Sequence, residues 1–140
     1  MDHLVCLDHE EFERLASGVS TMLVRGATER RAPHGQIGEG DTLYFLRDAA
    51  EGLVRARATV RAANSTPMLD PEASTIRLIQ NQRKLMLTER QAQRWAGKRF
   101  LVFVEMERFE AVEPFAVDRA LLASPEGWAV VADISVVRER

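Results

Sequence analysis

Within residues 53–62, the positions from Val54 onward alternate strictly between apolar and other side chains, and this pattern constrains the fold more than any other part of the sequence. The apolar positions are Val54, Ala56, Ala58 and Val60. The intervening positions are Arg55, Arg57, Thr59 and Arg61. Successive side chains of a β-strand point to opposite faces, so a period of two predicts a half-buried strand.

Five other stretches have the apolar, β-branched or aromatic content that is typical of strands. They are residues 3–7, 21–24, 42–46, 98–106 and 128–137. Within 98–106, one face carries Phe100, Val102, Val104 and Met106. Residues 26–40 hold four glycines and a proline among charged residues, which predicts an irregular surface loop.

Helices are predicted from their N-terminal signals. Asp8 and Glu11 have the spacing of a capping box, and Gly18 is placed to end that helix in the left-handed conformation. Asp70 before Pro71 predicts the start of a second helix, for which we expect an apolar stripe. Its members are Ala73, Ile76 and Ile79.

A third helix is predicted between Thr88 and Gly97, because Thr88 and Gln91 repeat the capping-box spacing. The elements then run as strand, helix, several strands, a helical insertion and two closing strands. This order lacks the regular alternation of a doubly wound parallel sheet. We therefore predict an α+β fold, a small mixed or antiparallel β-barrel flanked by helices, in a single domain spanning residues 1–140.

Composition narrows the class of protein. The chain has 140 residues, 46% of them hydrophobic and 29% charged, as in ordinary globular proteins. The single Cys6 excludes an internal disulfide and a cysteine zinc site. The three histidines are scattered, so we expect no metal site, and nothing predicts a cofactor.

No apolar run reaches membrane-spanning length and the first residues do not resemble a signal peptide, so we expect a cytoplasmic protein without a membrane partner.

The segment from Gly18 to Arg25 contains Ser20 and Thr21, and Gly40 with Asp41 opens a later strand. This arrangement resembles the ASCH family of PUA-like domains. The resemblance implies a cleft between a barrel and its helices, and functions that include RNA binding, ribonuclease-like activity and amide hydrolysis on acylated pyrimidine nucleosides. Hydrolase-like members carry a lysine where this chain has Ser20, and serine cannot supply the titratable group of a lysine.

The candidate site lies around the loop that follows this segment. Its charged members are Arg25, Glu29, Arg30, Arg31 and His34. The alternation of side chains along a strand would place Thr21 and Arg25 on one face. In a binding site, the arginines would then donate paired hydrogen bonds to phosphate or base edges, and Ser20 and Thr21 would donate further hydrogen bonds. The alternative is a solvated charged loop in which Glu29 neutralises its neighbours.

Two further sets of side chains have open interpretations. Arg55, Arg57 and Arg61 either bind a phosphate backbone or face water. Tyr44, Trp95 and Trp128 either stack on bases or pack in the core.

Three functions follow as hypotheses. The first is a module that binds RNA or a small nucleotide-like ligand through Ser20, Thr21, Arg25, Arg30, Arg31 and Arg57. The second is an enzyme acting on RNA or acylated nucleosides, with Thr21 and Glu29 as catalytic residues and Glu105 or His34 as further acid or base candidates. The third is a regulatory domain that contacts a protein partner. The net charge of −2 means that any nucleic-acid binding depends on a local basic patch.

Overall fold

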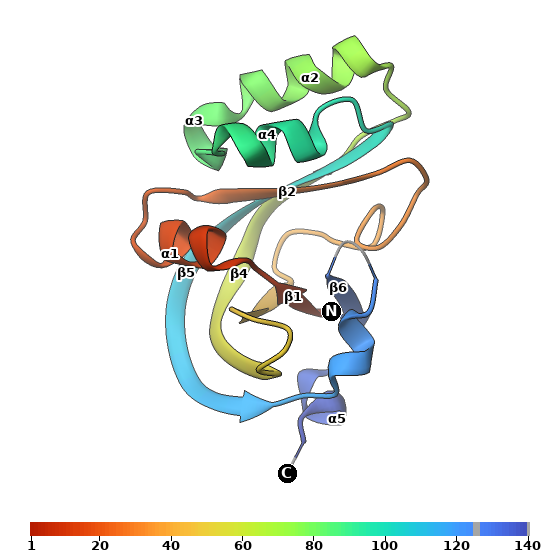
Figure 1. Cartoon of the computed structure of the whole chain (residues 1–140). Coiled ribbons are helices and arrows are strands. Elements are labelled where there is room, and N and C mark those ends of the chain that lie inside the picture. Colours follow the sequence, from red (N-terminus) through yellow and green to blue (C-terminus); the bar gives the residue numbers. More distant parts are fainter. Residues whose placement is uncertain (125–126, 140) are drawn as a thin grey trace.

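The computed structural model describes residues 1–124 and 127–139. Six strands form one mixed sheet in the order β2-β5-β4-β3-β1-β6. β1 runs parallel to β3, whereas the other neighbouring pairs are antiparallel. The strands are β1 (Asp2–Cys6), β2 (Met22–Ala27), β3 (Thr42–Leu46), β4 (Leu53–Ser65), β5 (Phe100–Ala116) and β6 (Trp128–Val131). The sheet curls into a half-barrel, so the α+β prediction is confirmed (Figure 1).

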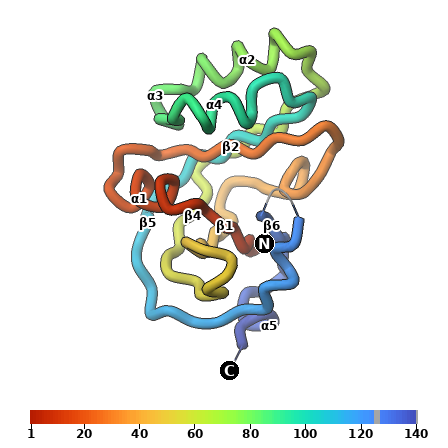
Figure 2. Tube along the Cα trace, viewed as in Figure 1, coloured from red at the N-terminus to blue at the C-terminus, as the bar shows by residue number. Residues whose placement is uncertain are grey.

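The helices lie at separate places around the sheet. They are α1 (His9–Ala16), α2 (Pro71–Gln80), α3 (Gln82–Leu85), α4 (Glu89–Trp95), the 3₁₀ helix Arg119–Leu122 and α5 (Ile134–Val137). Figure 2 shows α2, α3 and α4 together beyond β2, whereas α5 and the C-terminus lie at the opposite end of the molecule. Among the described residues, no helix combines the length and the apolar character needed to cross a membrane.

The alternation in β4 has the predicted consequence. The side chains of its apolar set are buried, and Val54 and Ala56 are wholly inaccessible to solvent. β5 differs because its first half is buried on both faces. Val102, Val104 and Met106 enter the barrel core, while Leu101 and Phe103 pack in a second core with residues of α2, α3 and α4. The helical insertion is therefore held by the outer face of β5.

The predicted helix boundaries are confirmed by their capping contacts. The Asp8 side chain accepts a hydrogen bond from the Glu11 amide, and the Thr88 side chain accepts one from the Gln91 amide. Asp70 caps α2 in the same way, with Pro71 in its first turn. Gly18 has a φ of 79°, as expected for a residue that ends a helix in the left-handed conformation.

Two predictions about packing and secondary structure were wrong. Ile76 and Ile79 do not form the buried stripe of α2, since 45% and 69% of their surfaces are exposed, and Ser74 and Leu78 face the core instead. The last apolar run is not one strand. β6 ends at Val131, and Asp133 then caps the short helix α5.

Candidate functional site

A cavity of about 630 Å³ lies where β1, β2 and α1 meet the connections around β3 and β6. Arg25 of β2 and Gly127, just before β6, both line it, and these two strands are the edges of the sheet. The cavity therefore lies at the seam that the half-barrel leaves open. Other charged lining residues are Asp8, Glu11, Arg47, Asp48 and Arg94.

Arg25 lies in the wall of this cavity and is only 4% exposed. Its Nη1 donates to Oε2 of Glu11 at 2.9 Å, and its Nη2 donates to Oε1 at 3.2 Å. The same two nitrogens also donate to the carbonyl oxygens of Val24 and Cys6. A two-point contact of this kind fixes the plane of the guanidinium as well as its position.

Glu11 is itself held by the first turn of α1. Its Oε1 accepts a hydrogen bond from the Asp8 amide at 3.4 Å, which is the return contact of the capping box. Asp8 is bound in turn by the side chain of Gln91, at 3.1 Å. The local sequence signal that begins α1 therefore also positions the carboxylate that orients Arg25.

Trp95 lies beneath two of the cavity's guanidinium groups. The ring centroid is 5.6 Å from the Arg25 guanidinium carbon and 4.5 Å from that of Arg94. Both distances are within the range of cation–π attraction. Trp95 is 4% exposed, so it supports the cations from below rather than offering a free stacking surface.

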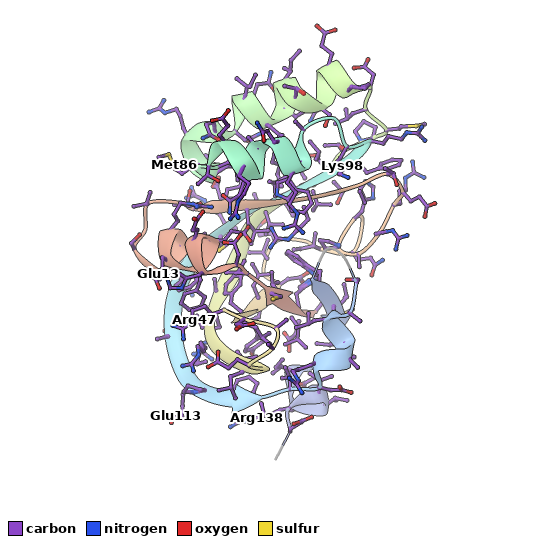
Figure 3. All side chains as sticks on the ribbon, viewed as in Figure 1. Glu13, Arg47, Met86, Lys98, Glu113 and Arg138 are labelled. Carbon is purple, nitrogen blue, oxygen red and sulfur yellow. The ribbon has the colours of Figure 1, made fainter. Side chains whose placement is uncertain are left out.

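Arg47 follows β3 and contributes a further cation to the cavity. Figure 3 shows it just below α1. Its guanidinium makes no hydrogen bond or ion pair within the described part of the chain, although its charge also acts on the Glu51 carboxylate. The guanidinium can therefore still donate to an anion in the cavity.

Cys6 is half-buried at the edge of the cavity. Burial raises the pKa of its thiol above the ordinary value, by more than the neighbouring Arg25 lowers it. The thiol is therefore protonated at neutral pH and is a weak nucleophile.

No protein-family model matches the sequence, and no curated protein matches it. Solved structures do match. The crystal structure of ASCH from Zymomonas mobilis aligns with a TM-score of 0.68 and 14% sequence identity, covering 99% of this chain and 96% of that one. A single-residue variant of the same protein aligns with a TM-score of 0.68 and 15% identity, covering 99% of both chains. This chain has the ASCH fold.

In this ASCH fold, the predicted residues Ser20 and Thr21 lie apart from the cavity wall. Ser20 is 5% exposed, and its Oγ lies within 3.0 Å of the carbonyl oxygens of both Met22 and Lys84. Its hydroxyl hydrogen is therefore engaged by the backbone. Thr21 is exposed before β2, where its amide donates to the Lys84 carbonyl. Thr21 does not line the cavity that contains Arg25.

The predicted loop residues divide into two groups. Glu29 and Arg31 line a narrow crevice that also reaches Arg25, and their charged groups lie 3.7 Å apart. Arg30 instead stacks over Phe100, at 5.2 Å from the ring centroid. His34 also packs on Phe100, and its Nε2 lies 2.7 Å from the Thr66 carbonyl, so this nitrogen carries a proton and donates.

A hollow of about 270 Å³ adjoins the cavity at Arg94. Arg31 and Lys98 also line it. Lys98 lies near the start of β5, close to the helical layer (Figure 3). Arg31, Arg94 and Lys98 therefore form a basic surface that continues outward from the cavity.

The remaining sequence candidates lie elsewhere. Arg57 is exposed on the outer face of β4 and pairs with Glu110 at 2.6 Å. Glu105 forms ion pairs with Lys84 and Arg61. Trp128 is 3% exposed and belongs to the barrel core, so it is not a stacking platform.

Sequence reasoning missed Arg47 and Arg94, because neither lies in a motif. Arg94 is one of several polar residues on a short helix, and Arg47 follows an ordinary strand. The three-dimensional fold brings both to Arg25. The only local signal in the sequence was the position of Arg94 directly before Trp95.

Proposed function

We propose that this chain is a binding module for RNA or a nucleotide-sized ligand, and that the cavity at the seam of the half-barrel is its binding site. The observation that carries the proposal is the set of three guanidinium groups, from Arg25, Arg47 and Arg94, on one cavity. Arginine presents a planar fork of donors that matches phosphate oxygens and base edges.

The size and shape of the cavity support this proposal. A volume of about 630 Å³ lies within the range of about 300–1,000 Å³ that is usual for small-molecule sites. The wall is rigid on the side of α1, because the capping box and the contact between Glu11 and Arg25 fix it. A preformed site loses less conformational entropy when it binds.

The cavity also holds three acidic groups, and each is already hydrogen-bonded within the protein. Glu11 is paired with Arg25, and Asp8 accepts hydrogen bonds from Gln91 and from the Glu11 amide. Asp48 accepts one from the Ala50 amide. Each carboxylate therefore has a donor of its own, and Arg47 is left to meet the ligand.

The test is a titration of short RNA, single-stranded DNA, mononucleotides and nucleosides, followed by tryptophan fluorescence, to which Trp95 beneath the site contributes. We expect saturable binding that weakens as salt rises, because phosphate contacts release counterions. Arg47→Gln should weaken binding about tenfold or more. Arg83→Gln is the matched control, because Arg83 lies on α3 and does not line the cavity.

Two outcomes would oppose the proposal. One is the absence of saturable binding by any of these ligands. The other is equal affinity of the Arg47→Gln variant and the unmodified protein. A response to nucleosides with turnover would instead favour the hydrolase alternative, for which the contacts around Thr21 and Glu29 give no support.

A further inference from the structure

A second hollow, of about 400 Å³, lies on the outer face of the sheet across β3, β4 and β5. No described residue lines both this hollow and the cavity that contains Arg25. Two cross-strand rows frame it. In one row Thr42 lies opposite Thr59, and in the other Tyr44, Arg57 and Glu110 lie side by side on the three strands.

A β-bulge directs Arg108 into this hollow. Arg57 pairs with Glu110 and Thr59 pairs with Glu107, so Arg108 and Phe109 together stand opposite Ala58. Arg108 has a φ of 58°, a left-handed conformation that side chains other than glycine rarely adopt. Bulges of this kind change the direction in which a side chain points.

Phe109 fixes the arrangement from the other side. It packs against the barrel core, stacking on Phe45 at 5.4 Å and meeting Phe12 edge-to-face at 5.8 Å. Because Phe109 is anchored in this way, the backbone of Arg108 is held at the hollow. The Tyr44 ring is likewise held, by an edge contact with Phe115.

Of the two arginines that line the hollow, Arg108 is the one whose charge can meet a ligand. Arg57 donates to Glu110, whereas Arg108 makes no hydrogen bond or ion pair in the described part of the chain. Three residues with hydroxyl groups, Thr42, Tyr44 and Thr59, line the same hollow. The hollow therefore offers a guanidinium and several neutral donors from different strands.

We propose that this hollow binds the phosphate group of a small phosphorylated molecule, with Arg108 as its principal contact. A carboxylate accepts hydrogen bonds largely in one plane, but a phosphate monoester presents three oxygens in a tetrahedral arrangement. Donors that approach from three strands suit the tetrahedral group better. The volume suits a small ligand rather than a wrapped polymer.

The experiment is a titration of the ¹⁵N-labelled protein with inorganic phosphate, ribose 5-phosphate and acetate, in which the side-chain Nε–Hε signals of the arginines are followed. We expect saturable shifts at Arg108 and Arg57 with both phosphates, and at least tenfold weaker binding of acetate. Arg108→Gly suits the left-handed backbone, so this variant should fold, and it should bind phosphate at least tenfold more weakly. Arg61→Gln on the same face of β4 should bind as the unmodified protein does.

Each possible result bears on the proposal. Tighter binding of ribose 5-phosphate than of inorganic phosphate would support it and add contacts to the sugar, and equal binding would support a site for the anion alone. Shifts confined to Arg25, Arg47 and Arg94 would overturn it, as would unchanged affinity in Arg108→Gly. Acetate that binds as tightly as phosphate would also overturn it. These signals separate this site from the first cavity, so the two proposals can fail independently.

Discussion

The indole Nε1–H of Trp128 donates a hydrogen bond to Nδ1 of His3, across 3.0 Å. Indole nitrogen only donates, so Nδ1 must be unprotonated. The proton of the neutral ring therefore lies on Nε2, which donates to Oδ2 of Asp41 at 2.9 Å. This chain of contacts joins β6, β1 and the residue before β3 in a place where His3 is wholly buried.

This arrangement predicts that the protein loses stability as the pH falls below about 6.5. Burial lowers the pKa of His3, and it does so by more than the contact with Asp41 raises it. The unfolded chain therefore takes up a proton that the folded protein resists, and the free energy of unfolding falls with decreasing pH. One proton limits the slope to about 1.4 kcal/mol per pH unit.

The measurement is urea unfolding at pH 7.5 and pH 5.5, followed by tryptophan fluorescence. This window avoids most carboxylate titration. His3→Gln removes the titrating ring, so its stability should be lower at pH 7.5 but should change less between the two pH values. The same pH dependence in the variant and the unmodified protein would show that His3 is not the group responsible.

A second prediction concerns the pair of Glu11 and Arg25, whose side chains are 11% and 4% exposed. Glu11→Gln keeps a residue that can complete the capping box but leaves the Arg25 charge without its carboxylate. We expect the free energy of unfolding to fall by about 3 kcal/mol, since removing one partner of a buried ion pair is strongly destabilising.

Chemical denaturation of Glu11→Gln tests this, with Glu13→Gln as the matched control on the exposed side of α1. The control should differ from the unmodified protein by less than about 0.5 kcal/mol. Similar small losses in both variants would mean that the ion pair contributes little.

The parts of the fold that the sequence predicted are those with local causes. Both capping boxes and the alternation of buried and exposed faces along β4 depend on residues a few positions apart, so they were visible without the structure. The second half of β5 was not predicted, because Glu107, Glu110 and Glu113 interrupt any apolar period. That half is held by pairing with β4 instead.

The candidate site was predicted only at Arg25. Arg47 and Arg94 reach it through the curvature of the sheet and the packing of α4, and neither is encoded by a local pattern. Ser20 has the same type of side chain that a binding site would need, but the carbonyl groups of Met22 and Lys84 engage its hydroxyl. Residue type alone does not distinguish a ligand contact from a backbone contact.

A third prediction is that Gly26→Ala destabilises the protein through crowding. An added Cβ would lie 2.9 Å from Cδ2 of Leu101 and 3.0 Å from Cγ of Lys98. Leu101 is wholly buried, so it has little room to move. We expect a loss of about 1–3 kcal/mol, which thermal unfolding would detect as a lower Tm.

Gly38→Ala is the control for this change. No atom lies within 4 Å of a Cβ at that position, and the residue is in an exposed turn. Its Tm should stay within a few degrees of that of the unmodified protein. If Gly26→Ala had the same Tm as Gly38→Ala, the contact between β2 and β5 would have to be looser than the structure shows.

A fourth prediction compares two buried hydroxyl groups, one with a hydrogen-bond partner and one without a partner among the described residues. Thr66 Oγ1 accepts a hydrogen bond from the Leu101 amide at 3.0 Å, whereas Ser74 Oγ has no hydrogen-bond partner among the described residues. Both residues are wholly buried. Thr66→Val keeps the shape but leaves a buried amide without an acceptor, so it should lower the free energy of unfolding by about 1–3 kcal/mol. Ser74→Ala removes a hydroxyl that has no contact to lose, so it should be neutral or stabilising. Urea midpoints of the two variants distinguish these effects, and equal destabilisation would contradict the assigned hydrogen bonds.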